Sequence, residues 1–124
     1  MALTIEEACA AVTTLIDESH RTALEKGWWK DPNRNVMEQL CLFHCEVSEA
    51  AEEYRRDGPE ALARIQFNVD GKEGKPGGFA VELADLLIRV FDTCGRYAIP
   101  LGEALRLKLE YNKSREYRHG NKHA

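Results

Sequence analysis

The segment from Phe79 to Tyr97, FAVELADLLIRVFDTCGRY, narrows the possible folds more than any other part of the chain. On a helical wheel at ~100° per residue it has a polar stripe only ~80° wide and an apolar arc of ~220°. An ordinary surface helix buries an arc of roughly 100° or somewhat more. The segment therefore predicts a helix that needs two separate neighbours and whose polar stripe opens on a cleft, a cavity or a partner. The stripe consists of Glu82, Asp85, Arg89, Asp92 and Arg96.

Helical patterns also fill most of the remaining sequence, and no strand-like alternation interrupts them. Thr4 and Glu7 form a capping-box pattern at the start of the first helix. The segment 71–78, GKEGKPGG, lacks the Gly-Lys-Ser/Thr ending of a P-loop, so we expect a flexible connection whose lysines could still meet a ligand. The chain is predicted to be a single domain, 1–124, with an all-α four-helix bundle fold. The expected helices are 5–26, 35–56, 79–97 and 101–112, with a weak helical turn at 59–65.

Composition and charge argue against several classes of protein. The formal net charge of −4 disfavours a general nucleic-acid binder, although basic residues concentrate in a tail from about residue 113. No apolar run approaches the ~20 residues that span a bilayer, and the start MALTIEEACA lacks the basic region of a signal peptide. We therefore expect a cytoplasmic protein with no nucleic-acid or membrane partner. The cysteines form no CxxC pair and are expected to be buried free thiols: Cys9, Cys41, Cys45 and Cys94.

Acidic side chains recur at helical spacing on two of the expected helices. Glu46, Glu49 and Glu53 share one face of the second helix, because they follow the i, i+3, i+7 rule. If this face meets the stripe that carries Glu82 and Asp85, the converging carboxylates need a positive charge between them. Mg²⁺ is the natural candidate, because it takes hard oxygen ligands and commonly bridges carboxylates to substrate phosphates. The alternative is two solvated acidic faces, paired with Arg55, Arg56, Arg89 and Arg96.

The motif Glu46-Val47-Ser48-Glu49, followed by Glu82-Leu83-Ala84-Asp85, resembles the ExxE…ExxD signature of the MazG-like all-α nucleoside triphosphate pyrophosphohydrolases. The similarity extends to KGWW, EVSEAAEEYR, FAVELADLLIRVFD and YNKSREYRHGNK, although the gap between the acid motifs is at the long end for that family. The resemblance implies helical bundles that assemble as homodimers or homotetramers, with the site near the subunit interface. It also implies Mg²⁺-dependent hydrolysis of a (deoxy)nucleoside triphosphate to the monophosphate and pyrophosphate, as nucleotide-pool house-cleaning.

The resemblance also implies roles for individual residues. The metal ligands are expected to be Glu46, Glu49, Glu82 and Asp85. Glu49 is expected to act as general base on the attacking water, and Glu53 could add a further ligand. The expected substrate-binding residues are Trp28, Trp29, Lys108, Asn112, Lys113 and Arg115. Arg89 stands where some family members carry an aromatic residue that contacts the base, so the preferred base and sugar stay open.

Other functions and assemblies remain open from the sequence. A relative that has lost catalysis could use the same helices as a dimerisation or partner-binding module, but the intact acid set favours an enzyme. An enzyme specialised for phosphoribosyl-ATP in histidine synthesis is a third reading. The wide apolar arc of 79–97 predicts a homodimer at least, because its two flanks need different neighbours. The number of metal ions and the choice between dimer and tetramer are not decided.

Overall fold

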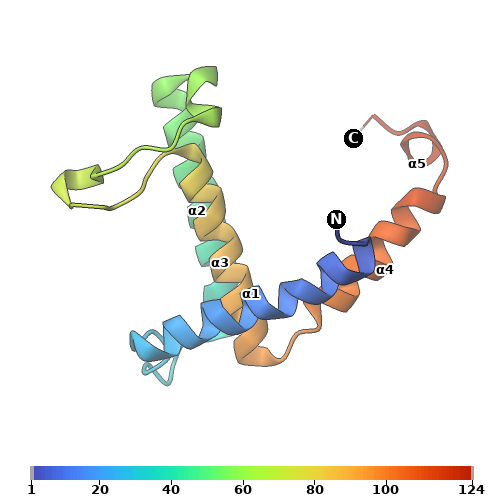
Figure 1. The fold of residues 1–124 in the computed structure, drawn as a ribbon, viewed down its shortest axis with the longest axis horizontal. Helices are drawn as coiled ribbons and strands as arrows, with labels where there is room; N and C mark the ends of the chain where they lie inside the picture. Colours follow the sequence, from blue (N-terminus) through green and yellow to red (C-terminus); the bar gives the residue numbers. More distant parts are fainter. Residues whose placement is uncertain (1, 124) are drawn as a thin grey trace.

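The computed structural model of the protein describes residues 2–123 and is all-helical, as predicted (Figure 1). Its long helices lie within two residues of the expected bounds, whereas a second 3₁₀ turn and a C-terminal turn of helix were not expected. No helix within the described residues is long and apolar enough to cross a bilayer. The elements are α1 (Ile5–Glu25), α2 (Val36–Asp57), η1 (Pro59–Ala63), η2 (Val69–Gly71), α3 (Phe79–Tyr97), α4 (Leu101–Ser114) and α5 (Arg118–Asn121).

Local capping interactions set the ends of the helices. The predicted capping box is present at α1, because Thr4 Oγ1 accepts a hydrogen bond from the Glu7 amide at 3.0 Å and Glu7 Oε1 accepts one from the Thr4 amide at 3.3 Å. The side chain of Asn35 caps α2 by accepting a hydrogen bond from the Glu38 amide at 3.0 Å. Pro100 separates α3 from α4, because it has no amide hydrogen with which to continue a helix.

The long helices form two arms that meet at an angle (Figure 1). α2 and α3 lie side by side in one arm, α4 packs on α1 in the other, and α1 also packs against α3. The contact between α1 and α3 is close, since a Cβ atom on Gly95 would lie 2.6 Å from Cβ of His20. Asp92 of α3 holds the same junction: its Oδ1 lies 2.8 Å from His20 Nδ1 and accepts a hydrogen bond from Trp29 Nε1 at 2.9 Å.

A buried polar network fixes the loop between α1 and α2. Gln39 is only 2% exposed, and its side-chain amide donates to Thr93 Oγ1 at 3.1 Å and accepts from Arg34 Nε at 3.0 Å. Arg34 Nη1 in turn donates to the backbone carbonyl oxygen of Trp28 at 2.7 Å. Because a buried amide is costly to leave unpaired, these bonds hold the loop in one position relative to α3.

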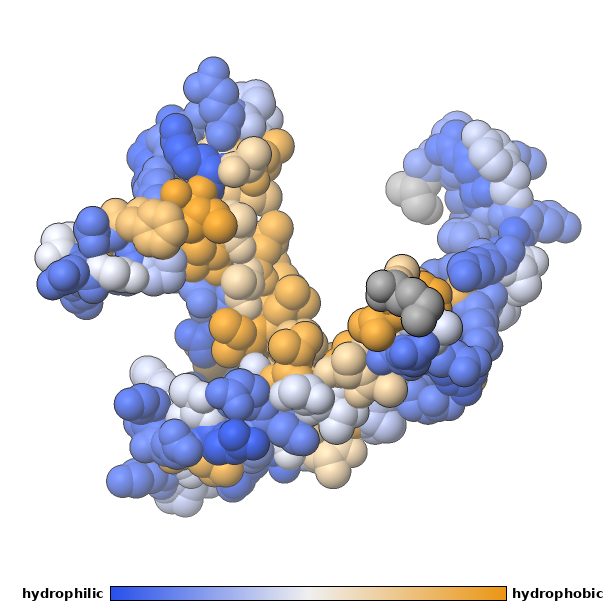
Figure 2. All heavy atoms as spheres, in the orientation of Figure 1, coloured by the Kyte–Doolittle hydropathy of each residue, from blue (hydrophilic) through white to orange (hydrophobic). Residues whose placement is uncertain are grey.

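A large apolar surface stays uncovered along the inner side of the angle between the arms (Figure 2). The expected four-helix bundle is therefore not closed within one chain, because α4 packs mainly on α1 and leaves α2 and α3 open. On α3, Leu83 and Leu87 remain 41% and 52% exposed, so one flank of its wide apolar arc has no neighbour in the chain. The exposed large apolar side chains of α2 and α3 are Val36, Met37, Leu40, Val47, Tyr54, Leu83, Leu87, Ile88 and Tyr97.

The cysteines divide into two groups. Cys9 and Cys94 are buried free thiols, as expected. The prediction is wrong for Cys41 and Cys45, which are exposed. Both lie on α2, which packs on α3 and η1 and is otherwise left open to solvent.

Candidate metal centre and the cavities beside it

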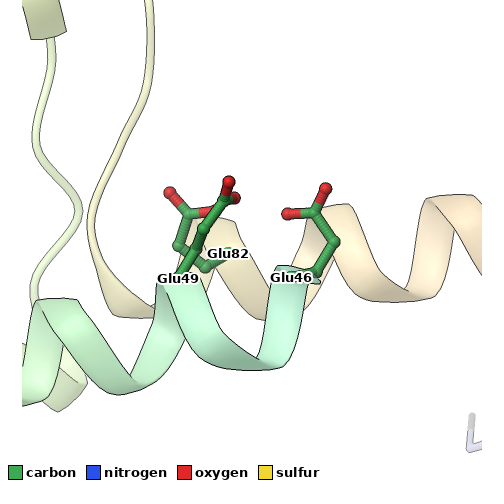
Figure 3. A group of neighbouring side chains, drawn as sticks. All are labelled: Glu46, Glu49 and Glu82. Carbon is green, nitrogen blue, oxygen red and sulfur yellow. The ribbon is translucent and has the colours of Figure 1, made fainter. Parts of the chain in front are cut away.

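Three carboxylates from two helices converge between α2 and α3 (Figure 3). Glu46 and Glu49 lie one turn apart on α2, and Glu82 lies opposite them in the first turns of α3. One carboxylate oxygen from each of the three lies within 4.8 Å of the others. The i, i+3 spacing thus brings both acids of α2 to the face that packs on α3, as the sequence predicts.

Asp85 stands one turn beyond Glu82 on α3 and completes the predicted acid set. Burial is the main cause that raises the pKa of Asp85, and the charge of Glu46 adds to it. The cations Arg89 and Lys75 act in the opposite direction on the same carboxyl pKa. Asp85 therefore shares the electrostatic environment of the cluster, although the three closest oxygens belong to the glutamates.

The cluster carries more negative charge than its surroundings neutralise. Burial raises the pKa of Glu82 to about 7, and the neighbouring Glu49 carboxyl contributes to this rise. The pKa of Glu49 is also raised, first by close contact with the Glu46 carboxyl and then by burial. Crowded carboxylates hold protons more tightly because like charges repel at short range. Without a cation between them, the carboxyls of Glu49 and Glu82 are therefore harder to ionise than ordinary glutamates.

One cation pairs with the cluster directly. Arg89, one turn beyond Asp85, donates from Nε to Glu46 Oε1 at 2.6 Å. Glu46 is only 5% exposed, so this ion pair offsets part of the cost of burying its charge. The other oxygen, Glu46 Oε2, is buried and accepts no hydrogen bond from the described residues, and the same holds for Glu82 Oε2.

The unpaired oxygens of Glu46 and Glu82 indicate whether the cluster fits a metal ion. Buried carboxylate oxygens without a donor are costly unless a cation or water meets them. The candidate metal ligands in the cluster are all carboxylate oxygens. Such ligands suit a hard cation such as Mg²⁺ better than a metal that prefers sulfur or imidazole ligands. Glu46, Glu49 and Glu82 could therefore hold a divalent ion, with Asp85 one turn away as a further ligand.

Two cavities border the acids, and Asp85 lines both of them. The larger, of about 850 Å³, is bordered by Glu49, Glu82 and Asp85 on one side and by the connection from α2 to α3 on the other. The smaller, of about 460 Å³, is bordered by Glu46 and Asp85 together with residues of α1, α3 and the loop that follows α1. A ligand with two chemically different ends could therefore lie across the acids.

The two tryptophans that were expected to bind the substrate have different environments. Trp28 is 61% exposed and borders the smaller cavity, so its ring is open to a ligand. Trp29 is 9% exposed, its indole N–H is bonded to Asp92, and Tyr97 and Arg96 pack on its ring. Trp29 is thus part of the packing at the junction between the arms.

The predicted phosphate-binding residues of the C-terminal region are not brought to the acids within this chain. α4 lies in the other arm, away from the acid-bearing part of α2 and α3 (Figure 1). Lys108 and Arg115 lie over the ring of Tyr111 at 5.1 and 5.3 Å, and Lys113 borders a separate pocket beside the start of α1. Asn112 lies on the same helix, with its backbone oxygen bonded to the Arg115 amide.

The structure adds cations near the site that sequence reasoning did not assign. The connection between α2 and α3 brings Arg64 and Lys75 to the larger cavity, where Arg56 at the end of α2 joins them. Glu53, considered as an extra ligand, borders this cavity but pairs with Arg56. The only signal in the sequence was the pair of lysines in GKEGKPGG, which by itself does not say where they point.

Comparisons of the chain with protein-family models, curated proteins and solved structures found no match. The function proposed below therefore depends on the geometry of the acids and cavities and on the resemblance of the two acid motifs to the ExxE…ExxD signature.

Proposed function

We propose that this protein is a Mg²⁺-dependent nucleoside triphosphate pyrophosphohydrolase of the MazG-like all-α type. The observation that carries the proposal is the convergence of Glu46, Glu49 and Glu82 on one point between α2 and α3, with Asp85 beside them. The unpaired buried oxygens of Glu46 and Glu82 favour a cation site over two solvated acidic faces. They also favour a catalytic protein over a helical module that only binds a partner, because such a module has no need for an unneutralised acid cluster.

The cavities support a particular orientation of the substrate. The smaller cavity offers the exposed ring of Trp28 and the apolar side chain of Ile88, together with polar groups, which suits a nucleoside. The larger cavity is more polar, and its lining includes Arg56, Arg64 and Lys75 beside six carboxylates, so it suits phosphates that are bound together with Mg²⁺. Asp85 borders both cavities, so the α- and β-phosphates of such a substrate would lie beside the acids. The base and sugar remain open, because Arg89 rather than an aromatic side chain lies next to Asp85.

The three carboxylates would have different roles in the reaction. When bound, Mg²⁺ would neutralise phosphate charge and lower the pKa of a nearby water. Glu49 would take a proton from the attacking water, because it is the most exposed of the three carboxylates. Glu46 and Glu82, which are more buried, would act as ligands.

We also propose that the active form is a homo-oligomer in which a second copy completes a helical bundle. The exposed flank of α3, with Leu83 and Leu87, and the apolar inner side of the angle support this assembly (Figure 2). A neighbouring chain could also bring its α4 to the acids, which would reconcile the predicted role of Lys108, Asn112, Lys113 and Arg115 with their distance from the site in a single chain. Light scattering at low micromolar concentration is expected to give at least twice the 14.1 kDa chain mass.

The proposed activity is tested by pyrophosphate release from a panel of canonical and modified (deoxy)nucleoside triphosphates. We expect release with Mg²⁺ and none in excess chelator. Glu49→Gln should lose most of the turnover while retaining the fold, whereas Glu73→Gln, an exposed acid on the connection, should behave as the unmodified protein. Absence of pyrophosphate with every substrate, or full activity in Glu49→Gln, would contradict the proposal.

A further inference from the structure

The connection between α2 and α3 forms a hairpin, whereas the composition of residues 71–78 had predicted only a flexible segment. Gln66 and Gly77 pair across it with hydrogen bonds of 2.9 and 3.0 Å, and the Val69 amide donates to the Lys75 carbonyl at 3.1 Å. The Asn68 side chain accepts a hydrogen bond from the Gly74 amide at 2.8 Å and so closes the turn. We call residues 66–77 the hairpin.

The close packing of the hairpin depends on a glycine. A Cβ atom on Gly77 would lie 2.5 Å from Val69 Cγ2, so any other residue would force the Val69 side chain or the backbone to move. The hairpin therefore has a defined shape that presents Lys75 at one position. That position is in the lining of the larger cavity, which Glu82 and Asp85 of α3 also border.

Lys75 differs from the other cations of this wall in its relation to the acids. Arg56 and Arg64 both pair with Asp57, at 3.1 and 3.2 Å, and Arg56 also pairs with Glu53. Lys75 pairs with Asp70 of its own hairpin at 2.7 Å. The ammonium of Lys75 is also near enough to Glu82 and Asp85 for their charges to raise its pKa, after the larger effect of Asp70.

We propose that Lys75 binds oxygen atoms of the pyrophosphate group that leaves the substrate. When the substrate enters, the ammonium group of Lys75 would give up its ion pair with Asp70 and pair with phosphate instead. This inference rests on the proposed function and adds a phosphate-binding element to it that belongs to the same chain as the acids. A pyrophosphate group carries several negative oxygens in a small volume, so it competes well with a single carboxylate for an ammonium group. The Lys75–Asp70 pair is exposed to solvent, with side chains 42% and 67% exposed, and such pairs are easily exchanged.

The test measures binding of inorganic pyrophosphate in the presence of Mg²⁺ by calorimetry, which does not require knowledge of the base. We expect Lys75→Met to weaken pyrophosphate binding by about 10-fold, as loss of a hydrogen bond to a charged group would. Lys72→Met is the matched control, because Lys72 lies on the same hairpin but does not border the cavity, and it should leave binding unchanged. Asp70→Asn should tighten binding, because the phosphate no longer competes with a carboxylate for Lys75.

Binding of Mg²⁺ alone separates a phosphate-binding role from a structural one. Lys75→Met should leave Mg²⁺ binding as strong as in the unmodified protein, whereas a misfolded hairpin that disturbed the acids would weaken it. Equal pyrophosphate binding by Lys75→Met and the unmodified protein would overturn this inference and leave the proposed function standing. Failure of the unmodified protein to bind either Mg²⁺ or pyrophosphate would overturn both.

Discussion

Removing the charge of Glu82 should stabilise the metal-free protein and at the same time abolish its response to Mg²⁺. In the folded chain the pKa of Glu82 is raised from 4.5 to about 7, chiefly by burial. The unfolded chain therefore releases this proton at a lower pH than the folded chain does. Because the folded state binds more protons between these two values, the free energy of unfolding falls as the pH rises through this window. Glu82→Gln removes this fall in the free energy of unfolding, since an amide does not titrate.

The stability that Glu82→Gln should gain follows from the shift in the pKa of Glu82. At about 1.4 kcal/mol per pKa unit, a rise from 4.5 to about 7 sets an upper bound of about 3 kcal/mol. Glu82 is only partly buried, and solvent screening should reduce this to about 1 kcal/mol. For a chain of this size, that corresponds to a rise in Tm of about 4 °C.

The assay is thermal unfolding at a fixed protein concentration, at pH 4.5 and pH 8, with chelator or with millimolar Mg²⁺. Glu82→Gln should match the unmodified protein at pH 4.5 and exceed its Tm at pH 8 in chelator. Mg²⁺ should raise the Tm of the unmodified protein at pH 8 by mass action but have little effect on Glu82→Gln. Glu73→Gln, an exposed control, should follow the unmodified protein throughout. A lower Tm for Glu82→Gln at pH 8 in chelator, or a retained Mg²⁺ response, would refute the reasoning.

Three further variants test other parts of the structure. Arg89→Met should lower the stability of the metal-free protein by about 2 kcal/mol, because buried Glu46 loses its ion-pair partner, and Mg²⁺ should restore part of it in a melting experiment. Gly77→Ala should weaken pyrophosphate binding by displacing the hairpin, and adding Val69→Ala should recover it; no change in the single variant would mean that the hairpin does not shape the site. Gln39→Leu should cost about 2 kcal/mol in urea unfolding, since buried Thr93 and half-buried Arg34 each lose a hydrogen bond; a neutral effect would contradict the importance of that network.

The helices and the acid pairs are local features, and for that reason they could be predicted from the sequence. The bounds of α3 follow from a strong helical period between Gly78 and the break at Pro100. The convergence of Glu46, Glu49 and Glu82 needs only the i, i+3 rule and the packing of two amphipathic helices against each other. The resemblance of the two motifs to the ExxE…ExxD signature then indicated a reaction that such a cluster could catalyse.

The hairpin and the place of α4 could not be predicted, because each depends on contacts between residues far apart or on unusual backbone angles. Asn68 and Asp70 adopt left-handed conformations, with φ of 58° and 57°, which composition alone does not indicate. The position of Lys75 follows from that shape. The direction of α4 depends on how α1 crosses α3, which involves the close approach of Gly95 to His20. A periodic pattern gives the buried face of a helix but not the neighbour that covers it.

The most direct test of the metal site is the anomalous diffraction of crystals of the protein grown with Mn²⁺, which has similar ligand preferences to Mg²⁺ and a strong anomalous signal. We expect an anomalous peak within coordination distance of Glu46, Glu49 and Glu82, and no such peak in crystals of Glu82→Gln. Crystals of the unmodified protein without a peak at these carboxylates, or with the ion bound only elsewhere, would contradict it.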